Sequence, residues 1–156
     1  MNRAFEAVID SPLGMLGIKL IDDRLAELHF LASDASEFSS DSLAVKKIIT
    51  ELGNYFTDAK HVFDVPYVLS GTALQRKIWQ VISKIPVGTT ISYGEVAKKL
   101  GTGPRVIGNA CRSNPIPIVI PCHRIVASNG DLCGYCGFTK GLSLNNKKWL
   151  LEHEKS

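Results

Sequence analysis

Apolar and polar positions alternate differently in the two halves of the chain, and the first half begins with strand-like patterns. Apolar runs at residues 4–9 and 15–21, followed by alternation over residues 24–31, predict three short strands. Turn-forming residues at positions 10–14 and 22–23 separate them, which favours an antiparallel meander. Residues 61–68 are a candidate for a further strand. Six apolar positions then recur at helical spacing and predict a helix: Val45, Ile48, Ile49, Leu52, Tyr55 and Phe56.

The second half favours helices instead. Apolar spacing predicts a helix from Leu74 that ends at residues 86–88, where Pro and Gly stop it. Ser92 and Glu95 form a capping-box pattern, which predicts that the next helix begins at Tyr93. We expect its buried face, and that of the following helix, to contain eight residues: Tyr93, Val96, Ala97, Leu100, Val106, Ile107, Ala110 and Cys111.

The break between these two helices has the composition of a tight turn. Gly101 and Gly103 interrupt the first helix, and Pro104 suits the first turn of the second, which must end before Asn114 and the proline after it. Two short helices joined by a glycine-containing turn resemble a helix-turn-helix. Two packed helices without any DNA role would show the same pattern, so the pattern alone leaves both interpretations open.

Composition and charge limit the class of protein. The chain has 156 residues, of which 45% are hydrophobic and 21% are charged, the balance of a soluble globular protein of one or two domains. We expect no membrane span and no secretory signal, and hence a cytosolic or nuclear protein. The formal net charge is only +3, so any contact with DNA should be local and of modest affinity.

Candidate chemistry gathers in residues 111–136, which hold all four cysteines: Cys111, Cys122, Cys133 and Cys136. In a reducing compartment such clustering indicates reactivity, a metal or chance rather than a disulfide scaffold. Residues 114–124 contain three prolines around an apolar run, so this segment is neither a helix nor a central strand. We expect a stiff, buried backbone that delivers Cys122 to a fixed place, which lowers the entropic cost of holding a nucleophile.

His123 is the adjacent candidate for the base that the Cys122 thiol would need. Neighbouring residues in an extended chain point in opposite directions, so we expect a bridging water between the two side chains. A histidine that takes a proton also needs a carboxylate partner. A buried structural cysteine beside a surface histidine would give the same adjacent pair, and adjacency alone does not choose between them.

A family resemblance adds to this picture. The segment Pro121-Cys122-His123-Arg124-Ile125 resembles the Pro-Cys-His-Arg-Val signature of the 6-O-alkylguanine-DNA alkyltransferases. Similar matches lie at residues 10–14, 74–79, 91–97, 105–115 and 149–154, so the resemblance covers nearly the whole chain. It implies an α+β protein with two domains. Residues 1–69 would form an N-terminal α/β domain, ribonuclease H-like, with a short antiparallel sheet and a helix. Residues 70–156 would form a mostly helical, winged-helix-like domain that carries the helix-turn-helix.

The resemblance also implies the activity. Such a protein is a methylated-DNA–protein-cysteine S-methyltransferase, which repairs DNA by direct reversal. It moves methyl or larger alkyl groups irreversibly from 6-O-alkylguanine, with 4-O-methylthymine as a second candidate lesion, onto its own cysteine. Each molecule acts once and needs no cofactor. The expected partner is double-stranded DNA that carries alkylated bases, bound by a monomer without any membrane association.

Residue by residue, Cys122 matches the alkyl acceptor, His123 the base that acts through a water, and Glu154 the carboxylate that orients the histidine. Asn114 matches an asparagine that ties the helix-turn-helix to the reactive loop. Tyr93 matches a tyrosine that is both catalytic and in contact with the target nucleotide.

The remaining implied residues contact DNA or the flipped base. Arg105 matches an arginine that fills the gap left by the flipped nucleotide, and Gly108 and Ala110 lie on the same recognition helix. Tyr135 and the backbone N–H of Cys136 match groups that line the guanine pocket. They would stabilise the charge that develops as the alkyl group leaves.

The chain departs from the family pattern after Gly137, where the pocket loop is about five residues longer. This leaves the roles of Tyr135 and Cys136 less firmly assigned than those of Cys122 and His123. Asn2, Ile21 and Ala26 stand where some members bind a structural zinc, so we predict no metal. Cys133 and Cys136 form a C-x-x-C pair, for which a zinc site and a redox disulfide are the alternatives to two ordinary cysteines.

Three other functions share some of these features. Alkyltransferase-like proteins bind lesions without repairing them, but they lack the cysteine that Cys122 provides. A helix-turn-helix transcription factor needs neither the reactive loop nor Glu154, and it usually dimerises on two half-sites. A cysteine hydrolase is compatible with Cys122 and His123 alone, but it would turn over many times.

Overall fold

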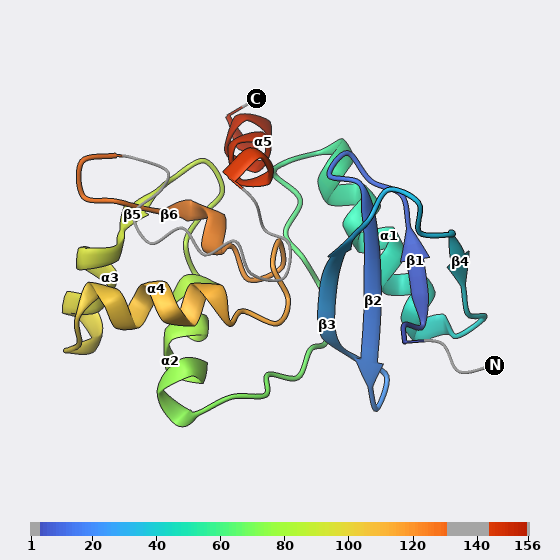
Figure 1. Cartoon of the computed structure of the whole chain (residues 1–156), viewed down its shortest axis with the longest axis horizontal. Coiled ribbons are helices and arrows are strands. Elements are labelled where there is room, and N and C mark those ends of the chain that lie inside the picture. The colour runs from blue at the N-terminus through green and yellow to red at the C-terminus, as the bar shows by residue number, and fades with distance from the viewer. Residues whose placement is uncertain (1–3, 131–143, 156) are drawn as a thin grey trace. The chain divides into compact units, whose positions relative to one another are not determined.

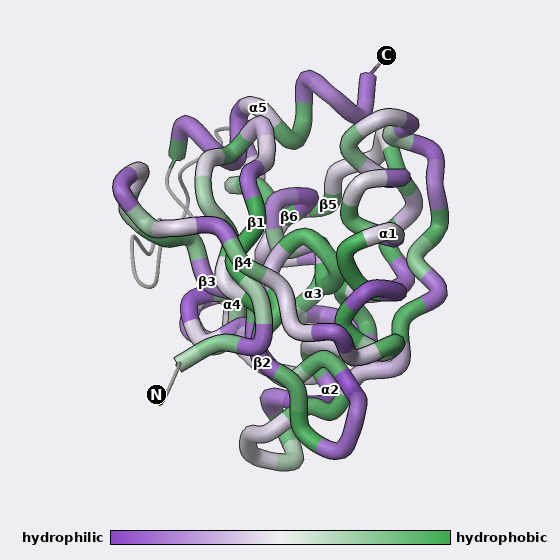
Figure 2. Tube along the Cα trace, turned by 90° about the vertical axis from the view of Figure 1, so that its right-hand side faces the viewer, coloured by the Kyte–Doolittle hydropathy of each residue, from purple (hydrophilic) through white to green (hydrophobic). Residues whose placement is uncertain are grey.

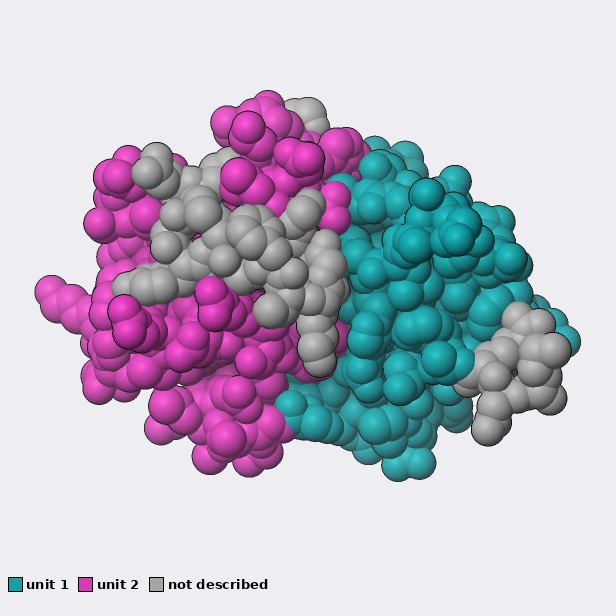
Figure 3. All heavy atoms as spheres, in the orientation of Figure 1, with its two compact units in different colours: residues 1–70 teal, residues 71–156 magenta. Residues whose placement is uncertain are grey.

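The structure, a computed structural model, describes residues 4–130 and 144–155. Its helices and strands are labelled in Figure 1. The chain divides into two compact units, residues 1–70 and 71–156, which are coloured separately in Figure 3. Both strands and helices are present, as the predicted α+β class requires, and the three strands predicted in the first half are all found.

Unit 1 contains an antiparallel sheet whose strand order is β3-β2-β1-β4. The strands are β1 (Ala7–Ile9), β2 (Met15–Ile21), β3 (Arg24–Leu31) and β4 (Phe38–Ser39). The two-residue β4 is too short to produce a sequence pattern and was not predicted. The strand expected over residues 61–68 is wrong. That segment makes only an isolated bridge between Tyr67 and Leu25, and Pro66 within it has no N–H to donate.

Helix α1 (Leu43–Thr57) begins where Ser42 caps it, with the Ser42 hydroxyl accepting from the Val45 N–H at 3.4 Å. Its trace alternates between hydrophobic and hydrophilic residues in Figure 2, as the sequence pattern predicts. The apolar side chains that this helix buries recur at helical spacing: Val45, Ile48, Leu52 and Tyr55. Together with Leu16, Ile18 and Leu25 of the sheet they form the core of unit 1.

Unit 2 contains three consecutive helices, α2 (Ala73–Ile82), α3 (Tyr93–Leu100) and α4 (Pro104–Arg112). The predicted capping box at the start of α3 is confirmed, because the Ser92 side chain accepts from the Glu95 N–H at 3.0 Å and the Glu95 side chain accepts in return. Gly101 ends α3 with φ of 66°, a left-handed conformation that glycine adopts without steric cost. The buried indole of Trp79 donates to the Ala110 carbonyl at 2.8 Å and so joins α2 to α4.

Two further pieces complete unit 2. The short strands β5 (Ile91–Ser92) and β6 (Ile125–Val126) pair in parallel and connect the start of α3 to the reactive segment. Helix α5 (Leu144–Glu154) buries Lys147, Leu150 and Glu154 on one side. In the described part of the chain, no helix is long and apolar enough to cross a bilayer.

Candidate active site

The reactive loop leaves α4 and carries its apolar side chains inward. Ile116, Ile118 and Ile120 are each at most 1% exposed, and the Ile120 N–H donates to the Ile116 carbonyl at 3.0 Å. The loop places Cys122 at the start of a 3-10 turn, η1 (Cys122–Arg124), with the residue only 4% exposed. The expectation of an extended chain at this point is wrong: Cys122 and His123 occupy a tight turn that begins immediately after Pro121.

Asn114 braces this loop against its own end. Its side-chain Nδ2 donates to the Ile120 carbonyl at 2.9 Å and contacts the Cys122 Sγ at 3.1 Å, while its Oδ1 accepts from the Ile116 N–H at 3.0 Å. The amide uses both its donor and acceptor groups. The structure thus brings Asn114 and Cys122 together, and the Cys122 sulfur has a hydrogen-bond donor beside it.

His123 and Glu154 lie 31 positions apart in sequence and form a buried pair. His123 Nε2 and Glu154 Oε2 are 2.8 Å apart, and each side chain is only 1% exposed. When the imidazole is neutral, Nε2 carries the proton that Glu154 accepts, which leaves Nδ1 as the acceptor nitrogen. Nδ1 is buried and has no hydrogen-bond partner within residues 4–130 and 144–155.

Burial lowers the pKa of His123, and the positive charges of Arg124 and Lys147 lower it further. The hydrogen bond and the negative charge of Glu154 oppose this shift without reversing it. The net effect favours the neutral imidazole, which is the form that can take up a proton.

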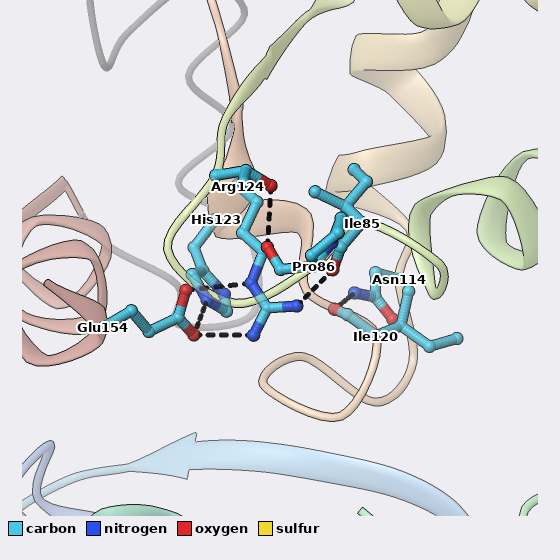
Figure 4. A network of polar contacts seen from close by, with 8 residues as sticks. Ile85, Pro86, Asn114, Ile120, His123, Arg124 and Glu154 are labelled. Carbon is cyan, nitrogen blue, oxygen red and sulfur yellow. Dashed lines mark hydrogen bonds and ion pairs between the residues drawn. The ribbon is translucent and has the colours of Figure 1, made fainter. Parts of the chain in front are cut away.

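Arg124 contacts both Glu154 oxygens. Its Nε donates to Oε1 and its Nη2 donates to Oε2, both at 2.8 Å, while Nη1 donates to the Ile85 carbonyl at 2.5 Å. Figure 4 shows the Glu154 carboxylate facing both His123 and the Arg124 guanidinium. The turn η1, helix α5 and the segment after α2 therefore meet in one network.

A buried lysine lies close to the reactive turn. Lys147 is 7% exposed, and its Nζ donates to the Ile125 carbonyl at 2.7 Å and lies 5.7 Å from the centre of the Tyr93 ring. Burial lowers the pKa of Lys147, an effect that the nearby Cys111 and Cys122 oppose. The adjacent Cys122 sulfur, together with burial, holds the pKa of the Cys111 thiol well above its ordinary value. Tyr93, only 5% exposed, is thus close to this cluster.

The residues expected at the DNA interface separate into two groups. Arg105 is exposed in the first turn of α4, where a side chain can reach a duplex. Gly108 and Ala110 are buried, and Ala110 is only 2% exposed because this side of α4 packs within unit 2. The prediction of DNA contacts by Gly108 and Ala110 does not agree with their burial. The exposed surface of α4 is formed by Arg105, Asn109 and Arg112 with Pro104.

Other predictions fall outside the described residues. Tyr135 and Cys136, expected in the substrate pocket, and Cys133 all lie in residues 131–143. Within residues 4–130 and 144–155, no three metal-ligating side chains gather at one point.

Sequence reasoning missed three residues of this cluster. Arg124 belongs to the signature that revealed the resemblance, yet no role was assigned to it, and Cys111 was expected only to pack. Lys147 was missed because a lysine in a C-terminal helix is ordinarily solvated. The usable signal was spacing: Lys147, Leu150 and Glu154 stand at i, i+3 and i+7, which puts both charged residues on the buried side of the helix with Leu150.

Comparisons with known proteins show which family this chain resembles. Residues 73–156 match the model of the family described as 6-O-methylguanine DNA methyltransferase, DNA binding domain. Methylated-DNA–protein-cysteine methyltransferases are similar over nearly their whole length. The protein of Mycobacterium tuberculosis is 37% identical over 95% of this chain and 90% of its own. That of Shigella flexneri is 39% identical over 99% and 97% respectively.

Solved structures show the same likeness. The crystal structure of the Mycobacterium tuberculosis O6-methylguanine methyltransferase superposes with a TM-score of 0.77 at 36% identity, covering 95% of this chain and 90% of that one. The Mycobacterium tuberculosis OGT crystallised in complex with DNA gives a TM-score of 0.78 at 37% identity, covering 95% and 91%. These matches confirm the resemblance noted in the sequence.

Proposed function

This chain belongs to the 6-O-methylguanine DNA methyltransferase family, and from that premise we propose that it repairs alkylated DNA by direct reversal. The proposed reaction moves an alkyl group from the O6 atom of guanine onto Cys122. The observation that carries the proposal is the buried Cys122 sulfur in the same short turn as His123, whose Nε2 is bonded to Glu154 at 2.8 Å. A nucleophile beside a base that a third group orients is the arrangement that such a transfer needs.

In the proposed step, the Cys122 thiol gives its proton through a bridging water to Nδ1 of His123, and the resulting thiolate attacks the alkyl carbon in line with the guanine oxygen. The S–C bond forms as the C–O bond breaks, and the electron pair of the C–O bond stays on the guanine. A proton taken up by the guanine ring balances the one that Cys122 lost. The product is an S-alkylcysteine, and because a thioether has no easy route back, each molecule acts once.

Asn114 and Lys147 support this step by stabilising negative charge on the sulfur. The Asn114 amide at 3.1 Å can donate to a sulfur that becomes negative, and the Lys147 ammonium adds a positive charge within unit 2. Preorganised donors and charges of this kind act in a site with little water, where they stabilise developing charge effectively. Tyr93 lies beside Lys147, and we propose that it contacts the target nucleotide.

For the DNA contact, we propose that α3 and α4 act as the helix-turn-helix, with α4 as the recognition helix. Arg105 is exposed at its start, which allows this side chain to enter the base stack and replace a flipped nucleotide. Tyr135 and Cys136 remain proposals for the base pocket. We expect a monomer bound to duplex DNA that carries alkylated bases, with modest affinity because the net charge is only +3.

The decisive experiment is to weigh the intact protein after incubation with a duplex that contains one 6-O-methylguanine. We expect the protein to gain one methyl group, mapped to Cys122, and no more than one lesion to be repaired per molecule. The C122A variant should gain nothing and still bind the lesion. Repair of many lesions per molecule would indicate a hydrolase, and lesion binding without any mass gain in the unaltered protein would indicate a binding module.

A further inference from the structure

Arg124 donates three hydrogen bonds in unit 2, which is more than neutralising the charge of Glu154 would require. It is only 7% exposed, and its Nε, Nη1 and Nη2 atoms donate to Glu154 Oε1, the Ile85 carbonyl and Glu154 Oε2 respectively. Two parallel N–H···O bonds from one guanidinium fix both the position and the plane of a carboxylate. The bond to Ile85 in turn fixes the guanidinium, so Glu154 is held against a backbone anchor outside its own helix.

The Glu154 oxygen that Arg124 Nη2 holds is also the one that His123 uses. Oε2 lies 2.8 Å from Arg124 Nη2 and 2.8 Å from His123 Nε2. The orientation of the carboxylate therefore sets the direction of the histidine N–H bond, and with it the direction in which Nδ1 points across the ring. Figure 4 shows the three side chains meeting at this carboxylate.

The charges in the network have a second consequence. A carboxylate buried to 1% exposure needs a positive partner, because an unpaired buried charge is strongly disfavoured. The guanidinium of Arg124 is always charged and supplies that partner. Without it, the negative charge of Glu154 would favour a proton on His123 more strongly, and an imidazolium cannot accept another proton.

From this geometry we propose that Arg124 is a positioning residue for the alkyl transfer, acting through Glu154. Its guanidinium holds the carboxylate in the orientation that His123 requires and supplies a positive charge beside this buried carboxylate. Arg124 does not itself touch the reacting atoms. The inference rests on the proposed roles of Cys122 as acceptor and His123 as base.

Three charged groups surround His123, namely Arg124 from η1 and both Glu154 and Lys147 from α5, with the Cys122 thiol adjacent in the turn. Burial lowers the pKa of His123, and Arg124 contributes to that lowering through its charge. This direction agrees with the geometry, because removal of the guanidinium should make protonation of His123 easier.

The first test measures single-turnover methyl transfer by the full-length protein against pH, with R124Q, R124K and the exposed-residue control R24K. In R124Q we expect the maximal rate to fall by roughly tenfold to a hundredfold through misplacement. The acid limb of its profile should move to higher pH, because His123 protonates more easily. R124K keeps the positive charge but loses the two parallel N–H···O bonds to Glu154. The acid limb of its pH–rate profile should therefore stay near that of the unaltered protein, while its maximal rate falls. R24K should follow the unaltered protein.

A double-mutant cycle tests whether Arg124 acts through Glu154. E154Q alone should slow transfer, and R124Q in the E154Q background should cost little more, because the group that Arg124 positions is already lost. Rate losses that multiply independently would overturn the proposal, as would R124Q and R124K profiles that coincide with that of the folded, unaltered protein.

An NMR titration of the His123 ring provides a measurement without DNA. In R124Q the pKa of His123 should rise relative to the unaltered protein, whereas in R124K it should change little. An unchanged His123 pKa in a folded R124Q variant would exclude the electrostatic part of the inference. If the unaltered protein transferred no methyl group, the proposed function would fail, and this titration would still decide what Arg124 does to His123.

Discussion

Both units contain a histidine bonded to a glutamate, and the more buried of the two such pairs in unit 1 differs from the pair in unit 2 in burial and in partners. In unit 1, His61 Nε2 lies 3.1 Å from Glu51 Oε1, with side chains that are 24% and 12% exposed. In unit 2, His123 and Glu154 are 2.8 Å apart and both 1% exposed. Glu51 also accepts from the backbone N–H of Asp64 at 2.6 Å, so it fastens a loop. Glu154 accepts instead from the Arg124 guanidinium.

A hydrogen bond between histidine and carboxylate therefore does not by itself indicate chemistry. The pair in unit 2 is distinguished by three features: a buried thiol in the same turn, the Arg124 guanidinium on the carboxylate, and a buried Nδ1. The pair in unit 1 has a structural task near the surface. Apart from Glu51, the buried acidic, basic and histidine side chains of the described chain all belong to unit 2: His123, Arg124, Lys147 and Glu154.

Replacing each histidine in turn tests whether only the pair in unit 2 takes part in the reaction. H123A should slow methyl transfer by about a hundredfold or more, because general-base catalysis contributes at least that much. H61A should transfer at the rate of the unaltered protein. Single-turnover mass spectrometry measures both rates. Equal losses in the two variants would show that the pairs are not functionally distinct.

A core substitution in unit 1 should affect stability and leave the chemistry unchanged. Ile48 is 1% exposed in α1, and I48A should lower the free energy of unfolding by about 2–5 kcal/mol through the cavity it leaves. Denaturant titration measures this change. The rate of methyl transfer per folded molecule should stay the same at a temperature where the variant is folded, and a tenfold lower rate would contradict the division of tasks.

Removing Arg105, the exposed arginine in the first turn of α4, should weaken binding without blocking the reaction. R105A should lower the affinity for a lesion-containing duplex by roughly tenfold, because a cation that replaces the flipped base is lost. R24A in unit 1 is the matched control and should bind normally. Titration by fluorescence anisotropy at fixed salt measures both affinities. Saturating DNA should restore most of the R105A transfer rate if the loss is in binding.

The smallest expected effect is on the pH dependence of stability. The pKa of folded His123 is lowered from its ordinary value of 6.5, so the unfolded chain binds a proton more readily than the folded chain. The free energy of unfolding should therefore fall as the pH drops below about 6.5, and it should level off below the folded pKa. H123Q should show a shallower fall over this range in denaturant titrations at several pH values. An identical fall in both proteins would contradict the lowered pKa.

The sequence predicted those elements whose causes are local. The capping box of Ser92 and Glu95 and the apolar spacing of α1 depend on residues close together in the chain, and both agree with the structure. The error over residues 61–68 has a different origin, since none of these residues is buried and the segment makes only the isolated bridge to Leu25. Strand β4 was missed because two residues produce no periodicity.

The site was less accessible to such reasoning. Residue types alone placed Cys122 and His123 together, but the pairing of His123 with Glu154 spans 31 positions and came only from the family resemblance. Arg124 and Lys147 are charged, and hydrophobic patterning assigns charged residues to the surface by default. Only the fold shows that each is buried with a specific acceptor. Gly108 and Ala110 were expected to contact DNA, but the packing of α4 buries them.

Ile118 has a backbone φ of 76°, an unusual value for a β-branched residue, and its side chain is 1% exposed inside the loop before Cys122. Such a conformation persists only where the surroundings impose it. A segment locked in this way has little freedom to adapt its shape to an incoming lesion. The adjustment needed to bring sulfur and damaged base together must therefore be made largely by the nucleic acid.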